Sequence, residues 1–329
     1  MSEVPAVSVV IPLYNKGPYI ARALNSVLAQ TFQDFEVIVV DDGSTDDGAE
    51  VVRGFDDPRI WLIQQENRGV SAARNRGIEA ARAELVAFLD ADDEWLPGFL
   101  ETILRLRTLY PDAGLYGTAY ELHYPGSIVE TVCTRNGGDR LLPSYFGAIV
   151  NYGPNNPHHP FNSSSFAAPK NILLGIGGFP RGVKWNEDVM LWGVVALQFP
   201  VAYSPDVCSI IHRHTANDSS EVTEYQESPF PQYVSTISKD ELLGRDDAED
   251  LTKYCDYLRL AAISRNIYSG HGARARLELS SVKSPHWTWK KYKLQMLSYI
   301  PQCGMQFIRN HAKSLSYLKR KIKTKIVHD

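Results

Sequence analysis

The first 110 residues alternate short apolar runs with segments of helical apolar spacing, and this alternation constrains the fold more than any other feature. Nearly continuous β-rich apolar runs are typical of strands that are buried on both faces of a parallel sheet. The pattern predicts strands at 7–11, 35–40, 60–63 and 85–89. It predicts helices at 19–29, 47–55, 70–81 and 98–109. Repeated strand–helix units imply right-handed crossovers, so we expect an α/β fold with a doubly wound, mostly parallel sheet.

The rest of the chain is less regular. We expect further strands at 113–124 and 207–212, a helix at 187–197, and a loop at 151–165 that is rich in Pro, Asn and Ser. A loop of this length in a compact domain is usually functional or mobile. Beyond residue 223 the pattern is mostly helical, most clearly at 246–267 and again at 305–327. The sequence therefore predicts one domain over residues 1–222 and a helical C-terminal extension over residues 223–329.

Composition excludes several classes of protein. The chain has 329 residues, of which 44% are hydrophobic and 22% charged, an ordinary globular mixture that is neither disordered nor fibrous. Its four cysteines are far apart and form no C-x-x-C pair, so we expect reduced thiols and a cytoplasmic protein rather than a zinc or disulfide framework. The N-terminus does not have the pattern of a signal peptide, and no run of about 18 apolar residues predicts a membrane span.

The net charge of −4 hides a strong asymmetry. Residues 283–329 contain eleven Lys or Arg and one acidic residue, so this tail carries +10 and the preceding residues carry −14. Apolar residues recur at helical spacing among the tail lysines, which is typical of a helix that lies on an anionic membrane surface. A homo-oligomer contact or a solvated basic helix is the alternative. We do not expect nucleic acid as a partner, because the body is acidic and no binding motif is present.

Two acidic motifs follow predicted strands. Asp41 and Asp42 end the second strand, and Asp90-Ala91-Asp92-Asp93 ends the fourth. Ligands of such sheets bind at the carboxyl ends of the strands. The first pair predicts hydrogen bonds to a nucleotide base or ribose, or else a capping cluster for the next helix. In the second motif, clustered carboxylates repel one another unless a cation compensates, and Mg²⁺ or Mn²⁺ prefers such oxygen ligands together with substrate phosphates.

Three further motifs carry potential chemistry. Arg74 lies in a basic segment that leads into a helix, where it could hold an anion or belong to a solvated basic face. The Glu187-Asp188 pair opens a helix, either as a source of a general base or as an acidic helix start that the dipole favours. His212 and His214 flank an arginine and are either ligands or structural residues. No G-x-G-x-x-G follows the first strand, which argues against a Rossmann dinucleotide fold.

In their order and spacing these motifs resemble family 2 glycosyltransferases, which have the GT-A fold. The matching segments lie within residues 7–214 and read SVVIPLYNKGPYIARALNSVLAQTF, FEVIVVDDGSTD, NRGVSAARNRGI, FLDADD, GIGGF and NEDVMLW. The resemblance implies an inverting enzyme that transfers a sugar from a nucleotide diphosphate, with a UDP-sugar expected first, to an acceptor hydroxyl. It also implies Mn²⁺ or Mg²⁺ as cofactor and a glycan or lipid-linked acceptor, so the cytoplasmic protein could be peripheral on the membrane.

The resemblance also implies roles for individual residues. Asp188 would be the catalytic base, and Asp92 and His214 would lie at the metal. Tyr14 would face the nucleotide base, which Asp41 would bind. The residues implied to line the nucleotide site are Pro12, Tyr14, Asn15, Asp41, Asp42, Arg74, Asp90 and Ala91.

The chain departs from the family pattern at two places. Pro180-Arg181 follow Gly-Gly-Phe where an acidic residue is common, and Asn186 stands where Gly is frequent. Neither change removes a catalytic group. A non-catalytic nucleotide-sugar binder or a membrane-docked scaffold remains the alternative from another class of protein. A nucleotidyltransferase is a second alternative, but it would carry a Gly-rich basic loop where this chain has Pro12-Leu13-Tyr14-Asn15.

Overall fold

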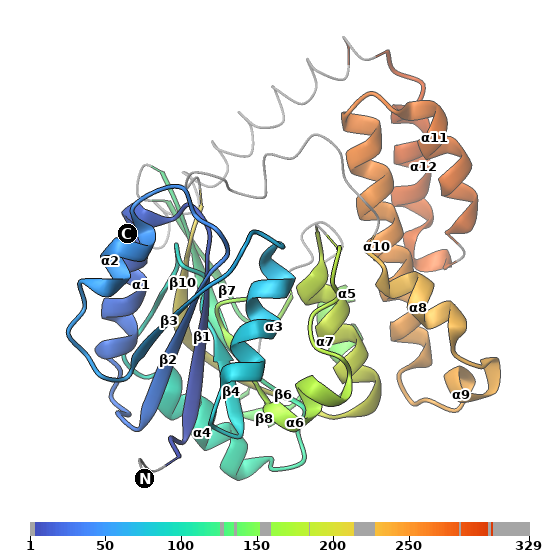
Figure 1. Ribbon diagram of the computed structural model, residues 1–329. Helices are drawn as coiled ribbons and strands as arrows, with labels where there is room; N and C mark the ends of the chain where they lie inside the picture. The colour runs from blue at the N-terminus through green and yellow to red at the C-terminus, as the bar shows by residue number, and fades with distance from the viewer. Residues whose placement is uncertain are drawn as a thin grey trace, which may run out of the picture.

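The computed structural model describes residues 4–125, 128–134, 137–151, 159–183, 185–213, 228–282, 284–301 and 304. A ten-stranded sheet lies at its centre, in the order β3-β2-β1-β4-β9-β6-β10-β5, with β7 paired to β6 and β8 to β10 (Figure 1). The strands are β1 (Val7–Leu13), β2 (Phe35–Asp41), β3 (Ile60–Gln64), β4 (Leu85–Phe88), β5 (Glu94–Trp95), β6 (Leu115–Tyr124), β7 (Ile128–Val132), β8 (Arg140–Leu141), β9 (Phe166–Pro169) and β10 (Val201–His212).

The N-terminal half of the sheet is parallel. Strand β1 pairs in parallel with β2 and β4, and β2 pairs in parallel with β3. Strand β9 lies antiparallel between β4 and β6, whereas β6 and β10 are parallel to each other. The predicted α/β fold with a doubly wound, mostly parallel sheet is confirmed. Its topology brings the carboxyl ends of β1, β2 and β4 to one edge.

Helices cover both faces of the sheet. The elements before the C-terminal region are α1 (Gly17–Leu28), α2 (Gly48–Arg53), α3 (Val70–Ala80), α4 (Phe99–Leu109), α5 (Tyr145–Val150), α6 (Lys170–Gly175) and α7 (Glu187–Gln198). Side chains alternate along β1, so that Val9 joins the core beneath α1 and α4, whereas Val10 joins the core beneath α3 and α7. This alternation explains why β1 is apolar on both sides, since each face packs against its own helical layer.

The C-terminal helices pack against the second of these cores. They are α8 (Phe230–Thr236), α9 (Lys239–Leu243), α10 (Ala248–Tyr268), α11 (Gly272–Glu278) and α12 (Thr288–Leu297), with short 3₁₀ turns at Leu279–Ser281 and Pro285–Trp287. Tyr254 of α10 and Phe230 of α8 contact Phe146 of α5, with ring centroids 5.4 and 5.8 Å from that of Phe146. These helices therefore share a hydrophobic core with the sheet. The predicted division after residue 222 falls outside the described residues.

Several elements had no clear signal in the sequence. Helix α5 is six residues long and is capped by Ser144, whose hydroxyl accepts a hydrogen bond from the Gly147 amide. Strand β9 contains two alanines and ends at Pro169, so it lacks a clear β pattern. The helix predicted at 305–327 and His214 both lie outside the described residues. Within the described ranges, the helices are too short or too polar to span a membrane.

Candidate active site

A pocket of about 600 Å³ opens at the carboxyl ends of β1, β2 and β4. Most residues predicted for the site line it, namely Pro12, Tyr14, Asp42, Arg74, Asp90, Ala91, Asp92 and Asp188. Asn15 and Asp41 do not belong to its lining among the described residues, and His214 falls in a part of the chain that the structure does not describe. The topology thus brings the two acidic strand-end motifs and the Glu187-Asp188 pair to one cavity.

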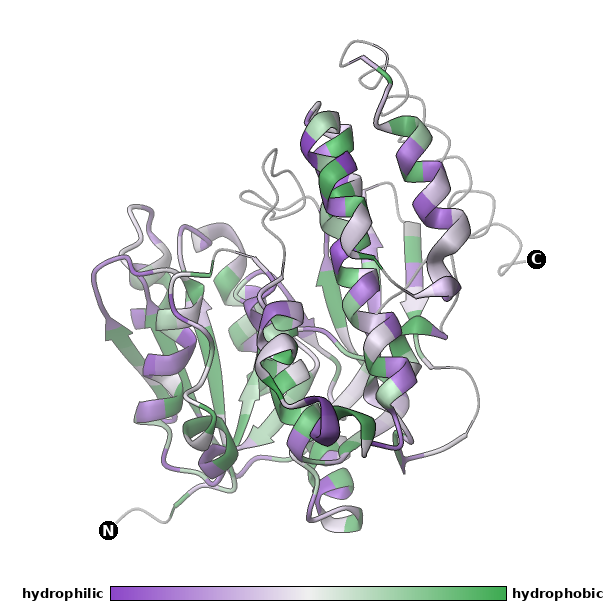
Figure 2. Ribbon diagram, turned by 90° about the vertical axis from the view of Figure 1, so that its right-hand side faces the viewer, coloured by the Kyte–Doolittle hydropathy of each residue, from purple (hydrophilic) through white to green (hydrophobic). Residues whose placement is uncertain are grey.

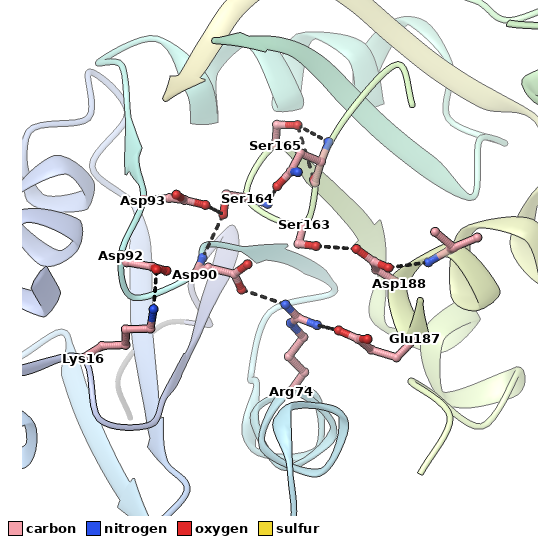
Figure 3. A network of polar contacts seen from close by, with 12 residues as sticks. Lys16, Arg74, Asp90, Asp92, Asp93, Ser163, Ser164, Ser165, Glu187 and Asp188 are labelled. Carbon is pink, nitrogen blue, oxygen red and sulfur yellow. Dashed lines mark hydrogen bonds and ion pairs between the residues drawn. The ribbon is translucent and has the colours of Figure 1, made fainter. Parts of the chain in front are cut away.

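Arg74 joins two of the acidic motifs. Its guanidinium donates to Asp90 Oδ1 at 2.7 Å and to Glu187 Oε1 at 2.8 Å, and its side chain is only 3% exposed (Figure 3). Burial disfavours the charge, but the two carboxylates outweigh this effect and raise the pKa of Arg74 above its ordinary value. The buried cation therefore holds the end of β4 against the first turn of α7.

Asn75, the residue after Arg74, joins helix α3 to the Gly-Gly-Phe motif. Asn75 donates to the Phe179 carbonyl at 2.8 Å and accepts from the Phe179 amide at 2.8 Å. Gly178 adopts φ +72°, and a Cβ there would come within 2.3 Å of the Asn75 side chain. Only glycine suits both the conformation and the close approach. The Phe179 ring in turn lies under the Arg74 guanidinium at 5.1 Å, so the Gly-Gly-Phe motif supports Arg74 from below.

The carboxylates of the acidic turn after β4 have different partners. Asp92 Oδ2 pairs with Lys16 Nζ at 2.6 Å, and the two side chains are 17% and 13% exposed. Asp93 is buried, where it accepts from the Ser164 hydroxyl at 2.6 Å and from the His212 amide at 3.0 Å. Burial and the charges of Asp92 and Asp90 raise the pKa of Asp93 well above its ordinary value. All three carboxyl residues line the pocket, but Asp93 is also anchored in the fold by Ser164 and His212.

A run of three serines before β9 connects these motifs to the predicted base. The Ser163 hydroxyl donates to Asp188 Oδ2 at 2.7 Å. The Ser164 hydroxyl accepts from the Asp90 amide at 3.0 Å, and the Ser164 carbonyl accepts from the Trp95 indole at 2.7 Å. Figure 3 shows Ser163 and Ser164 between the acidic turn and the start of α7. Neither serine was predicted, because the polar loop sequence around them gives no signal for contacts this distant.

The Glu187-Asp188 pair opens α7 through an unusual backbone conformation. Asn186 precedes the helix with φ 61°, the left-handed region that Gly and Asn tolerate best. Asparagine can therefore replace the glycine of the family pattern. Burial and the charge of Asp188 raise the pKa of Glu187 to about 7, although Arg74 opposes the shift. Glu187 is thus committed to Arg74, which leaves Asp188 as the carboxylate held by Ser163 at the pocket.

The first acidic motif organises its own loop. Asp41 is buried and accepts from the Ser44 amide and the Gln64 side chain, both at 3.0 Å. Asp42 accepts from the amides of Arg68 and Gly69 at 2.9 and 2.8 Å. Asp42 therefore positions the loop that leads into α3 while it lines the pocket.

Asn15, just after β1, contacts the loop that follows β2. Its side-chain oxygen accepts from the Thr45 amide at 2.8 Å, and its own amide donates to Ser44 Oγ at 3.0 Å. These contacts tie the end of β1 to the Gly-Ser-Thr turn after β2. Asn15 itself has φ 50°, in the left-handed region that asparagine tolerates better than most residues.

Further residues that the sequence did not assign line the pocket, among them Lys16, Trp185, Arg213 and Arg265. Arg265 comes from α10, so the C-terminal helices contribute to the cavity. His212 also lines the pocket and pairs with Glu94 at 2.8 Å, and burial lowers its pKa. Sequence patterns could not place Arg265, since it is separated from every motif by a long helical segment.

The donor atoms suit a hard divalent cation. Six residues with a carboxyl group and four Lys or Arg line the pocket. The described residues form no group of three His, Cys, Asp or Glu with metal-site geometry. Mg²⁺-type ions are often held by only one or two carboxylates, with substrate phosphates supplying the other ligands. Asp92 and Asp90 fit such a shared site.

Residues 8–121 match the family model described as "Glycosyl transferase family 2", which confirms the resemblance that the motifs indicated. Validoxylamine A glucosyltransferase from Streptomyces hygroscopicus is 33% identical over 208 residues, which are 61% of this chain and 41% of that protein. The chain spans less than half the length of the curated relatives it matches.

Solved structures confirm the GT-A fold class. TarS 1–349 of S. aureus, in complex with UDP-GlcNAc, has a TM-score of 0.64 at 18% identity, with 89% of each chain covered. Mannosyltransferase PcManGT from Pyrobaculum calidifontis, in complex with GDP-Man and Mn²⁺, has a TM-score of 0.59 at 19% identity, with 92% of this chain and 88% of that one covered. Both TM-scores indicate that this chain shares its fold with the two solved structures.

Proposed function

We propose that this protein is an inverting, metal-dependent glycosyltransferase with Asp188 as its general base. The observation that carries the proposal is the placement of Asp188 in the same pocket as Asp90, Asp92 and Arg74. A base for the acceptor and a diphosphate-binding region are both needed for transfer from a nucleotide sugar. The match of residues 8–121 to glycosyl transferase family 2 supports the same reaction class.

The donor would be a nucleotide-diphosphate sugar, and we expect a UDP-sugar first. Pro12, Tyr14 and Asp42 line the part of the pocket built by β1 and β2, so we assign them to the nucleoside. Tyr14 is 44% exposed, which leaves its ring free to stack on a base. UDP-GlcNAc in TarS and GDP-Man in PcManGT support a nucleotide-sugar donor in this fold.

The reaction would be a single displacement. Asp188 takes the proton from the acceptor hydroxyl while that oxygen forms its bond to the anomeric carbon. The bond between this carbon and the phosphate oxygen breaks, and the nucleoside diphosphate leaves with the electron pair. A divalent cation, Mn²⁺ or Mg²⁺, held by Asp92 would neutralise charge on the diphosphate when bound. Ser163 fixes the orientation of the Asp188 carboxylate throughout.

We assign acceptor binding to pocket side chains outside the motifs that bind the donor. Trp185, Arg213 and Arg265 line the same pocket but belong to none of the nucleotide motifs. An aromatic ring and two cations suit a glycan or a lipid-linked acceptor with anionic groups. We propose that the C-terminal region, residues 223–329, helps to select the acceptor at the cytoplasmic face of a membrane.

The test compares binding with turnover. The purified full-length protein is incubated with a panel of UDP- and GDP-sugars and Mn²⁺, and thermal shift and nucleotide release are both measured. The cognate donor should raise the melting temperature of a transferase. The enzyme should also release nucleoside diphosphate slowly, and faster when an acceptor is added. Donor binding without any nucleotide release, over a broad acceptor panel, would identify the non-catalytic binder instead.

A further inference from the structure

Helix α12 carries two apolar faces, and the fold uses only one of them. Leu294 is 4% exposed, and Trp287, just before the helix, is 2% exposed. The Trp287 indole donates to the Lys253 carbonyl of α10 at 2.8 Å, so this face is packed onto α10. An amphipathic helix that had only to pack on the core would be polar on its other face.

The outer face is aromatic instead. Trp289, Tyr292 and Met296 of the helix are 82, 65 and 73% exposed, and Tyr299 in the turn after the helix is 65% exposed. The spacing of three and four residues places Trp289, Tyr292 and Met296 on one side of the helix. Figure 2 views the molecule from the side on which these C-terminal helices lie. Large exposed apolar groups that gather on one helix mark an interaction site, whereas single ones need no explanation.

We propose that this outer face of α12 binds an anionic lipid membrane surface. Trp and Tyr are enriched where a protein meets the boundary between headgroups and acyl chains. Lys293 is exposed on the same helix, and the sequence has no acidic residue between Glu278 and Asp329. The positive charge around the aromatic side chains is therefore complementary to anionic headgroups.

A second copy of the chain is a poorer occupant for this face. A twofold contact would place the same surface against itself, so that the exposed Lys293 would approach its own copy with no acidic partner on this segment. Like charges across an interface are unfavourable, and lysine is depleted from protein–protein contacts. Membrane binding by this face does not depend on the chemistry of the pocket.

The test is flotation of the full-length protein with phosphatidylcholine vesicles that contain or lack phosphatidylglycerol. We expect binding only with the anionic lipid, and loss of that binding in the double variant Trp289→Ser/Tyr292→Ser. Lys293→Gln removes one charge and should weaken binding about fivefold. The matched control is Trp61→Ser, which removes a 54% exposed tryptophan from β3 and should bind normally.

A second measurement works even if the double variant is unstable. Brominated lipids quench tryptophans that enter the membrane, and Trp289→Phe keeps an aromatic side chain there. We expect the variant to bind vesicles but to lose most of the quenching of the wild type. The proposal is overturned if the wild type does not bind anionic vesicles, or if Trp289→Phe is quenched as strongly as the wild type. Dimer dissociation by Trp289→Ser without any vesicle binding would also overturn it, in favour of a subunit contact.

Discussion

Ser163 Oγ lies 2.7 Å from Asp188 Oδ2 and donates a hydrogen bond to it. Ser163 comes from the segment before β9, whereas Asp188 belongs to the first turn of α7. The second oxygen of Asp188 accepts from the Val189 amide at 2.7 Å. The carboxylate is thus fixed at both ends, yet each oxygen keeps a lone pair for an acceptor hydroxyl.

We predict that Ser163→Ala lowers kcat by roughly tenfold with little change in the KM for the donor, because an unfixed base reaches the right geometry less often. Ser163→Thr keeps the hydroxyl and should restore most of the loss. Steady-state kinetics at saturating acceptor give both constants. Equal losses in the Ala and Thr variants would show that packing at this position matters rather than the hydrogen bond.

Replacement of the proposed base should separate catalysis from binding. Asp188→Asn removes the proton acceptor but keeps the shape of the side chain, so we expect transfer to fall by roughly 10²–10⁴. Binding of the nucleoside diphosphate, measured by calorimetry, should remain close to wild type. Asp240→Asn on the exposed α9 is the matched control. Turnover of Asp188→Asn at the wild-type rate would refute its assignment as the base.

Glu187 gives a prediction for the pH dependence of stability. Its pKa is raised from an ordinary value of 4.5 to about 7 in the folded protein, first by burial and then by Asp188. Between these pH values the folded state binds a proton that the unfolded state has released. This group's contribution to the free energy of unfolding is therefore fully present at pH values below about 4.5, and it is lost as the pH rises through about 7.

The measurement is urea unfolding of the metal-free protein at several pH values between those limits. The wild type should lose stability relative to Glu187→Gln as the pH rises, since glutamine does not titrate. Glu66→Gln, at a position where the side chain is 92% exposed, is the control and should follow the wild type. A constant difference between the wild type and Glu187→Gln across this range would contradict the raised pKa.

The sequence predicted the parts of the site that lie at strand ends. Asp42, Asp90 and Asp92 follow strong apolar strands, so the sheet topology alone placed them together. Contacts between distant loops gave no comparable signal. Lys16 and Asp92 are 76 positions apart, and Ser163 and Asp188 are 25 apart. Such pairs depend on how the loops pack, which neither hydrophobic periodicity nor local motif spacing encodes.

Removal of divalent cations should abolish transfer. We expect activity to disappear after dialysis against EDTA and to return when Mn²⁺ or Mg²⁺ is added. Asp92→Ala should weaken Mn²⁺-dependent binding of nucleoside diphosphate by at least about tenfold, because the site loses a carboxylate ligand. Asp34→Ala, an exposed position outside the pocket, is the control. Full activity in EDTA would exclude a metal-assisted reaction.

Lys16 should compete with that cation. Its ammonium lies 2.6 Å from Asp92 Oδ2, the oxygen that we assign to the metal, and both side chains are largely buried. A divalent ion that binds Asp92 must displace this ammonium and lose the energy of the ion pair, which weakens binding of the metal. Lys16→Met keeps the length of the side chain but removes the charge.

We therefore expect the variant to bind Mn²⁺ more tightly than the wild type in the absence of nucleotide, as measured by the electron paramagnetic resonance signal of free Mn²⁺. Lys239→Met, at an exposed position on α9, should leave the affinity unchanged. Weaker Mn²⁺ binding by Lys16→Met would mean that Lys16 holds Asp92 in place for the metal rather than competing with it.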